Sequence, residues 1–148
     1  MEIKLHKINR DNNHNLSFFE ATGFSMWPFL RTEDKLVVKK VPLEELKIGD
    51  IILYIKDNQT ICHRLVKKIG YKEKYLLYAR GDNSKSIESV NENMLKGKVI
   101  GILRGNRMKN LTTGFQRFIN HIAVIFNPFI RGSLKIAKFL VGLHETKR

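Results

Sequence analysis

Short apolar runs separated by polar turn residues make up most of the first two thirds of the chain. Five runs carry the β-branched and aromatic residues typical of strands: 35–40, 50–55, 60–69, 74–80 and 98–103. Asp57-Asn58 and Gly70 mark expected hairpin turns. Residues 42–47 and 91–95 have room for one helical turn each. Closely spaced strands with short turns predict a mainly β fold, a small antiparallel sheet or partly closed barrel.

The pattern changes after Gly105, where apolar residues recur at helical spacing. Phe115, Phe118, Ile119, Ile122 and Phe126 would share one face of a helix. Asn127-Pro128 is suited to end that helix and to begin another. The sequence therefore predicts a C-terminal amphipathic helical pair. It divides into a polar N-terminal segment (1–20), a β-domain (21–106) and a basic helical tail (107–148).

Charge adds a second expectation about partners. The 148 residues include 27 Lys or Arg and 14 Asp or Glu, a net charge of +13. Residues 107–148 hold eight of the basic residues and a single acid, Glu145. Such an excess favours an anionic partner: nucleic acid, an acidic polypeptide or an anionic membrane. The single cysteine, Cys62, excludes an internal disulfide and a multi-cysteine zinc site, and we predict no metal and no cofactor.

The predicted tail leaves two arrangements open. The first 15 residues lack the apolar stretch of a targeting signal, and charged residues interrupt the apolar region 115–143. We therefore expect a cytoplasmic or peripherally membrane-associated protein, with no transmembrane helix and no cleaved signal peptide. The two helices either lie in an anionic membrane interface or pack their apolar faces on the β-domain.

Three short motifs contain residues that are able to carry chemistry. Ser25 follows a glycine-containing turn, His63 lies within a predicted strand, and Asp82 belongs to a Gly-Asp-Asn turn. Because side chains alternate along a strand, His63, Leu65 and Lys67 should share one side. Taken singly, each motif is more typical of a structural residue. Taken together, the residues suit a nucleophile, a general base and a carboxylate that orients the base.

Five boxes closely resemble those of the signal peptidase I family and cover about residues 21 to 105. They are Gly23-Phe24-Ser25-Met26-Trp27-Pro28, Gly49-Asp50-Ile51-Ile52, His63-Arg64-Leu65-Val66, Gly81-Asp82-Asn83 and Gly97-Lys98-Val99-Ile100-Gly101. The resemblance implies a serine endopeptidase that cleaves a leader or signal-like peptide, built as a mostly antiparallel β-domain with a shallow substrate groove. It implies Ser25 as nucleophile, His63 as base and Asp82 as the acid of the triad. Gly23, Ser25, Met26 and Pro28 would form the oxyanion hole and groove.

This sequence departs from the family pattern in informative ways. Histidine at position 63 is similar to the endoplasmic-reticulum and archaeal type, whereas bacterial housekeeping enzymes carry lysine there. The histidine type often has a further acidic pair after the Gly-Asp-Asn box, and here only Glu88 is a candidate. Gly23 stands where some relatives place a serine that assists the oxyanion hole. With no membrane anchor before Ser25, the chain looks more like the small, stand-alone members.

Other interpretations compete with an active peptidase. An inactive member would bind a leader peptide or a membrane surface without cleaving. The self-cleaving repressors of the LexA and phage type share the clan, but they use a lysine base and need an N-terminal DNA-binding unit for which residues 1–20 leave no room. A nucleic-acid-binding β-domain would interleave aromatic and basic residues on one strand, which this sequence does not do. We therefore predict a peptide or protein substrate and no nucleic-acid partner.

Overall fold

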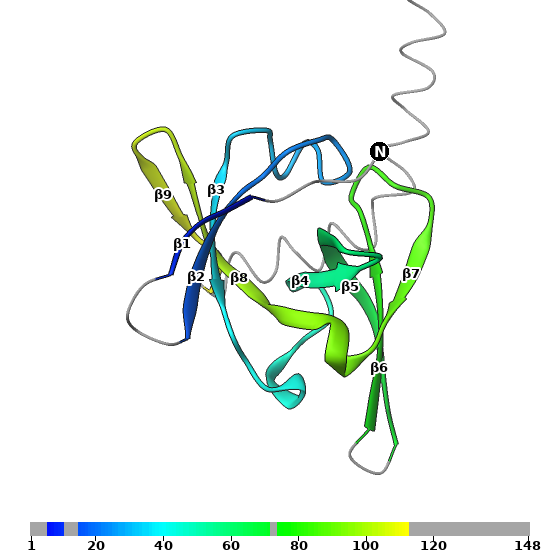
Figure 1. The fold of residues 1–148 in the computed structure, drawn as a ribbon. Helices are drawn as coiled ribbons and strands as arrows, with labels where there is room; N and C mark the ends of the chain where they lie inside the picture. The colour runs from blue at the N-terminus through cyan, green and yellow to red at the C-terminus, as the bar shows by residue number, and fades with distance from the viewer. Residues whose placement is uncertain (1–5, 11–14, 72–73, 113–148) are drawn as a thin grey trace, which may run out of the picture.

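The computed structural model describes residues 6–10, 15–71 and 74–112, which form a curled, half-open barrel of antiparallel strands (Figure 1). The elements are β1 (His6–Arg10), β2 (Leu16–Glu20), β3 (Lys35–Lys39), the 3-10 helix η1 (Leu43–Glu45), β4 (Ile51–Lys56), β5 (Gln59–Tyr71), β6 (Lys74–Arg80), β7 (Ile87–Val90), the 3-10 helix η2 (Glu92–Met94), β8 (Leu95–Arg104) and β9 (Arg107–Asn110). The strand order is β1-β2-β3-β8-β4-β5-β6-β7, with β9 paired to β8. The mainly β prediction is therefore confirmed.

The five predicted strands correspond to β3, β4, β5, β6 and β8, and the two predicted helical turns to η1 and η2. Asp57 and Asn58 have φ of 49° and 59°, so they form a two-residue hairpin turn that suits the right-handed twist of β4 and β5. The predicted turn at Gly70 is wrong. Gly70 lies within β5 opposite Tyr75, where an added Cβ would come within 2.7 Å of Cε1 of that ring.

The sheet extends beyond the predicted β-domain at both ends. β2 pairs with β3 along its whole length and β1 pairs with β2, so strands occur before residue 21. β9 pairs with β8, and Leu111 packs into the core with 3% of its surface exposed, so the sheet continues beyond residue 106. The side chains of β2 are all half-buried, so this strand lacks the clear division into buried and exposed positions by which the other strands were recognised. The predicted helical pair lies outside the described residues.

The two central strands are buried on both faces. Ile51, Leu53 and Cys62 belong to one hydrophobic cluster, whereas Tyr54 and Ile61 belong to another across the sheet. Because side chains alternate along β5, consecutive residues point into different clusters. This arrangement decides which partners the polar residues of β5 can reach. It also buries the thiol of Cys62, and burial raises the pKa of that thiol above its ordinary value.

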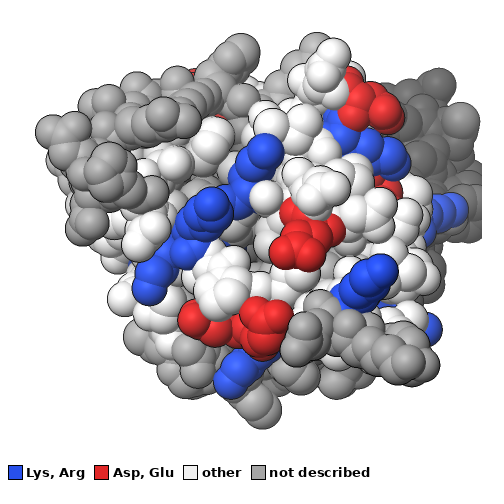
Figure 2. All heavy atoms as spheres, turned by 60° about the horizontal axis from the view of Figure 1, so that its bottom comes forward, with Lys and Arg blue, Asp and Glu red and all other residues white. Residues whose placement is uncertain are grey.

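The outer surface carries charges of both signs. Figure 2 shows the molecule turned so that the bottom of Figure 1 faces the viewer, and on this face basic side chains lie beside acidic ones. Two largely buried carboxylates form ion pairs with residues of β8, Asp50 with Lys98 at 2.7 Å and Asp34 with Arg104 at 2.6 Å. Within the described ranges, no helix is long and apolar enough to cross a bilayer.

Candidate active site

Ser25 lies in the loop between β2 and β3, in a turn that the surrounding residues fix. Gly23 has φ of 86°, a left-handed conformation that glycine adopts without strain. The N–H of Trp27 then donates to the carbonyl of Phe24 at 3.2 Å and closes the turn. Phe24 and Trp27 are 53% and 41% exposed, whereas Ser25 between them is 5% exposed. The turn therefore directs the serine inward.

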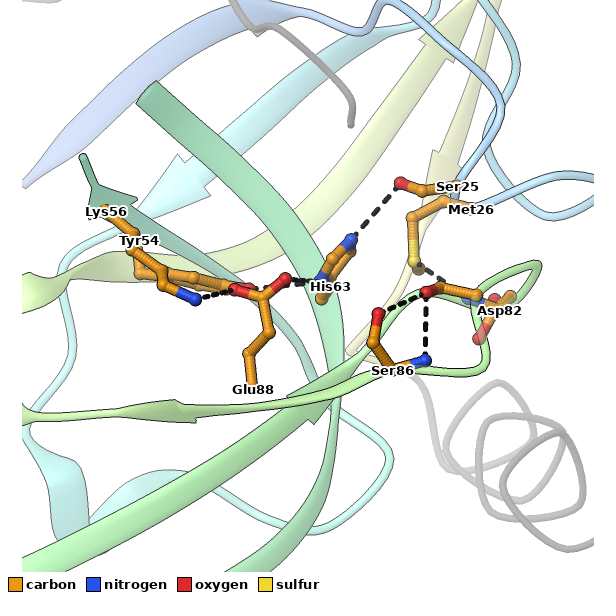
Figure 3. Close-up of polar contacts among 9 residues, drawn as sticks. Ser25, Met26, Tyr54, Lys56, His63, Asp82, Ser86 and Glu88 are labelled. Carbon is orange, nitrogen blue, oxygen red and sulfur yellow. Dashed lines mark hydrogen bonds and ion pairs between the residues drawn. The ribbon is translucent and has the colours of Figure 1, made fainter. Parts of the chain in front are cut away.

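Met26 anchors this serine loop from below. Its side chain is completely buried in the hydrophobic cluster beneath the loop. Its Sδ accepts a hydrogen bond from the N–H of Asp82 at 3.4 Å (Figure 3). The prediction that Met26 lines a substrate groove is therefore wrong for its side chain, because that side chain belongs to the core. Pro28 is exposed at the end of the turn.

The Gly81-Asp82-Asn83 loop holds the serine loop in place. Asn83 donates its backbone N–H to the carbonyl of Ser25 at 2.6 Å and its side-chain Nδ2–H to the carbonyl of Phe24 at 3.3 Å. An added Cβ at Gly81 would lie 2.6 Å from the Ser25 carbonyl oxygen and 3.1 Å from Nε2 of His63. Only glycine leaves space for this approach. The absence of a side chain at Gly81 thus allows the serine loop to lie close to His63.

Ser25 and His63 form the hydrogen-bonded pair that the motifs predicted. Ser25 Oγ lies 3.2 Å from Nε2 of His63, on β5 (Figure 3). His63 is 2% exposed, and burial lowers the pKa of its imidazole below the ordinary value. The charges of Glu88 and Asp82 oppose this shift in pKa, and the charge of Lys56 adds to it. A lowered pKa keeps the ring neutral at pH 7, the form that accepts a proton.

Tyr54 and Glu88 occupy the other side of the imidazole. The Tyr54 hydroxyl lies 3.0 Å from Nδ1 of His63 and donates to Glu88 Oε2 at 3.2 Å. Lys56 Nζ holds the same carboxylate oxygen at 3.1 Å. The Tyr54 hydroxyl therefore lies between the imidazole of His63 and the carboxylate of Glu88.

Strand register brings these residues together across four strands. Ile52 on β4 is opposite His63, and Tyr54 is two residues further along the same face. On β6, Ala79 is opposite both Leu65 of β5 and Glu88 of β7. The small side chain of Ala79, fully buried, leaves room for the Glu88 carboxylate to reach over β6. Glu88, the candidate that the family resemblance suggested, therefore lies beside the histidine.

Asp82 does not take the place predicted for it. Its carboxylate receives two hydrogen bonds from Arg64, from Nε at 2.8 Å and from Nη2 at 2.6 Å. Arg64 also donates from Nη1 to the carbonyl of Gly49 at 3.0 Å and lies 4.7 Å from the centre of the Phe29 ring. Because Arg64 follows His63 directly on β5, it faces the opposite side of the sheet. The prediction that Asp82 accepts the N–H of His63 is wrong, since both ring nitrogens have other partners.

Three further findings bear on the chemistry. Among the described residues, the N–H of Ser25 has no hydrogen-bond acceptor, so it remains available to an oxyanion. A bulge between Leu65 and Lys67 interrupts the alternation, and Lys67 therefore leaves the side that His63 occupies. The described part of the chain contains no group of three or more His, Cys, Asp or Glu placed to hold a metal ion.

Sequence reasoning missed Tyr54 and Lys56 altogether. The two-residue turn at Asp57-Asn58 was a usable signal, because it fixes Lys56 opposite Gln59 and hence Ile52 opposite His63. Tyr54 then follows on the same face. The reach of Glu88 across β6 has no such local signal. Comparisons of this chain with family models, with curated proteins and with solved structures found no match.

Proposed function

We propose that this protein is a serine endopeptidase of the signal-peptidase kind, which cleaves a leader or signal-like peptide. The observation that carries the proposal is the 3.2 Å contact between Ser25 Oγ and Nε2 of the buried His63. Serine peptidases need this contact because serine is a weak nucleophile until a base removes its proton. The resemblance of the five boxes to signal peptidase I, together with the antiparallel half-barrel, supports the family assignment.

The dyad can carry both halves of an acyl-transfer reaction. As Ser25 Oγ bonds to the substrate carbonyl carbon, its proton passes to His63 Nε2 and the carbonyl oxygen takes the negative charge. Collapse of this intermediate breaks the C–N bond, and Nε2 returns the proton to the leaving amine. Water then attacks the acyl-enzyme, with His63 as base again, and releases the carboxylate product and free Ser25.

The oxyanion would be held by backbone donors. The N–H of Ser25 is unoccupied among the described residues, and Gly23 contributes no side-chain hydroxyl. A single oxyanion donor is typically worth about 2.7–4 kcal/mol in the transition state. Loss of the loop geometry should therefore lower activity even where the dyad is intact.

The proposed substrate is an extended peptide with small side chains next to the scissile bond, added to a strand edge by backbone hydrogen bonds. This part rests on the family resemblance. The exposed side chains of Phe24 and Trp27 flank the nucleophile and offer apolar contacts for residues further from the bond. Contact of the peptidase with anionic membrane through residues 107–148 belongs to the same proposal.

The test is covalent labelling of Ser25 by a compact serine-directed acylating probe. A compact probe is needed because Ser25 is only 5% exposed. We expect mass spectrometry to find one acyl group on Ser25 in the wild type and none in Ser25→Ala or His63→Ala. Ser89→Ala, which removes an exposed serine on β7, should label normally. Full labelling of Ser25→Ala would overturn the assignment. A folded wild type that does not label would favour the inactive, peptide-binding alternative.

A further inference from the structure

We propose that Tyr54 is a positioning residue, whose hydroxyl is held by Glu88 and fixes His63 in the tautomer that leaves Nε2 free for Ser25. The catalytic meaning of this inference rests on the proposed function. The tautomer itself is a property of the folded protein and is measurable without any substrate.

The directions of the hydrogen bonds carry the inference. A carboxylate only accepts hydrogen bonds, so the Tyr54 hydroxyl is the donor in its 3.2 Å hydrogen bond to Glu88 Oε2. The hydroxyl can then meet His63 Nδ1, 3.0 Å away, only as an acceptor. A neutral imidazole has one N–H, and placing it on Nδ1 removes it from Nε2. Each contact in the series thus determines the next.

Glu88 is not placed to do this directly. Its nearer oxygen, Oε1, lies 4.0 Å from Nδ1, which is beyond hydrogen-bond distance. The tyrosine hydroxyl closes that distance because it is able to donate and accept at once. A neutral hydroxyl beside Nδ1 also orients the ring without the full charge of an adjacent carboxylate, so the base stays unprotonated in its buried site.

The surroundings keep the hydroxyl and the carboxylate in place. Tyr54 is completely buried, and its ring meets the imidazole edge-on with 6.0 Å between ring centres. Lys56, also on β4, binds the oxygen of Glu88 that accepts from Tyr54. Ala79 provides the space through which Glu88 reaches them. Among the described residues, the charged groups that act on His63 are Glu88 from β7, Lys56 from β4 and Asp82 from the loop after β6.

The decisive experiment is ¹⁵N NMR of the imidazole of His63 in the full-length protein at a pH where the ring is neutral. We expect the wild type to carry its proton on Nδ1. Tyr54→Phe removes the acceptor, and Glu88→Ala frees the hydroxyl to donate to Nδ1, so both variants should shift the proton to Nε2. Glu88→Gln keeps an oxygen that accepts from Tyr54 and should restore the wild-type tautomer.

A matched control is Tyr75→Phe, which removes a hydroxyl from a ring packed against the same cluster as Tyr54. It should leave the tautomer unchanged. If the ring proton stays on Nδ1 in both Tyr54→Phe and Glu88→Ala, or if it lies on Nε2 in the wild type, the inference is overturned. Tyr54→Phe should also slow acylation of Ser25 about tenfold, the usual effect of one lost hydrogen bond. A wild type with the Nδ1–H tautomer but no acylation would refute the proposed function alone.

Discussion

His63 and Arg64 are consecutive residues of β5, yet their side chains lie on opposite faces of the sheet and have different acidic partners. His63 faces Tyr54 and Glu88, whereas Arg64 forms a two-pronged ion pair with Asp82. Both side chains are almost fully buried. One face of the strand thus carries the candidate chemistry, and the other face secures the loop that positions Ser25.

Replacement of Asp82 should lower the stability of the fold more than it impairs His63 as a base. Asp82→Asn leaves the guanidinium of Arg64 buried without its counter-charge, and breaking a buried ion pair in this way costs about 3–5 kcal/mol. We expect chemical denaturation to show that loss in the free energy of unfolding. The exposed Glu44→Gln should change it by less than about 0.5 kcal/mol. Unchanged stability with abolished acylation would return Asp82 to the role of triad member.

A methyl group at Gly81 should separate the nucleophile from its base. In Gly81→Ala the new Cβ would lie 2.6 Å from a backbone oxygen of Ser25, so the serine loop must move. We expect acylation of Ser25 to fall at least tenfold. Gly101→Ala is the matched control, since its Cβ would clash with the flexible, exposed end of Met108 at 2.6 Å and would lie at an ordinary contact distance, 3.6 Å, from the Lys109 carbonyl oxygen. Equal acylation rates in the two variants would show that the close approach at Gly81 is unimportant.

The pH dependence should follow the lowered pKa of His63. Activity should rise as the imidazole loses its proton, with a midpoint below the ordinary value of about 6.5. Stability has the same sign: the unfolded chain binds this proton more readily, so the contribution of His63 is present above about pH 6.5 and is lost as pH falls through the folded-state pKa. Rate measurements from pH 4 to 10 and unfolding measurements from pH 4 to 8 test the two expectations. Activity that rises only above pH 9 would indicate a lysine base.

Charges around His63 should move its pKa in opposite directions. Glu88 raises this pKa and Lys56 lowers it, so Glu88→Gln should shift the titration of His63 downward and Lys56→Met should shift it upward. NMR titration of the imidazole measures both shifts. Lys67→Met is a suitable control, because the Lys67 ammonium lies over the Tyr78 ring and is not among the charges that shift the pKa of His63. Shifts of the same sign in the first two variants would contradict the arrangement.

Local patterns predicted what depends on neighbours in sequence. The β-branched runs located β3, β4, β5, β6 and β8, and Asp57-Asn58 marked the hairpin that sets the Tyr54–His63 relationship. The boxes indicated the Ser25–His63 pair. The partners of the buried charged residues were harder to predict, because Asp82 and Glu88 both follow β6 and only the tertiary fold decides which of them reaches His63. The prediction for Gly70 was wrong because the glycine at this position makes room for the Tyr75 ring and does not form a turn.

Glu88 is carried by β7, a four-residue strand that pairs with β6 at one end of the sheet order. Short edge strands detach in local openings that cost far less free energy than global unfolding. When β7 detaches, Tyr54 loses its acceptor while His63 stays in the core. We therefore expect amide hydrogen exchange at β7 to be faster than at β5. Opening of this edge strand, rather than overall unfolding, would then set the fraction of molecules that hold a correctly oriented base.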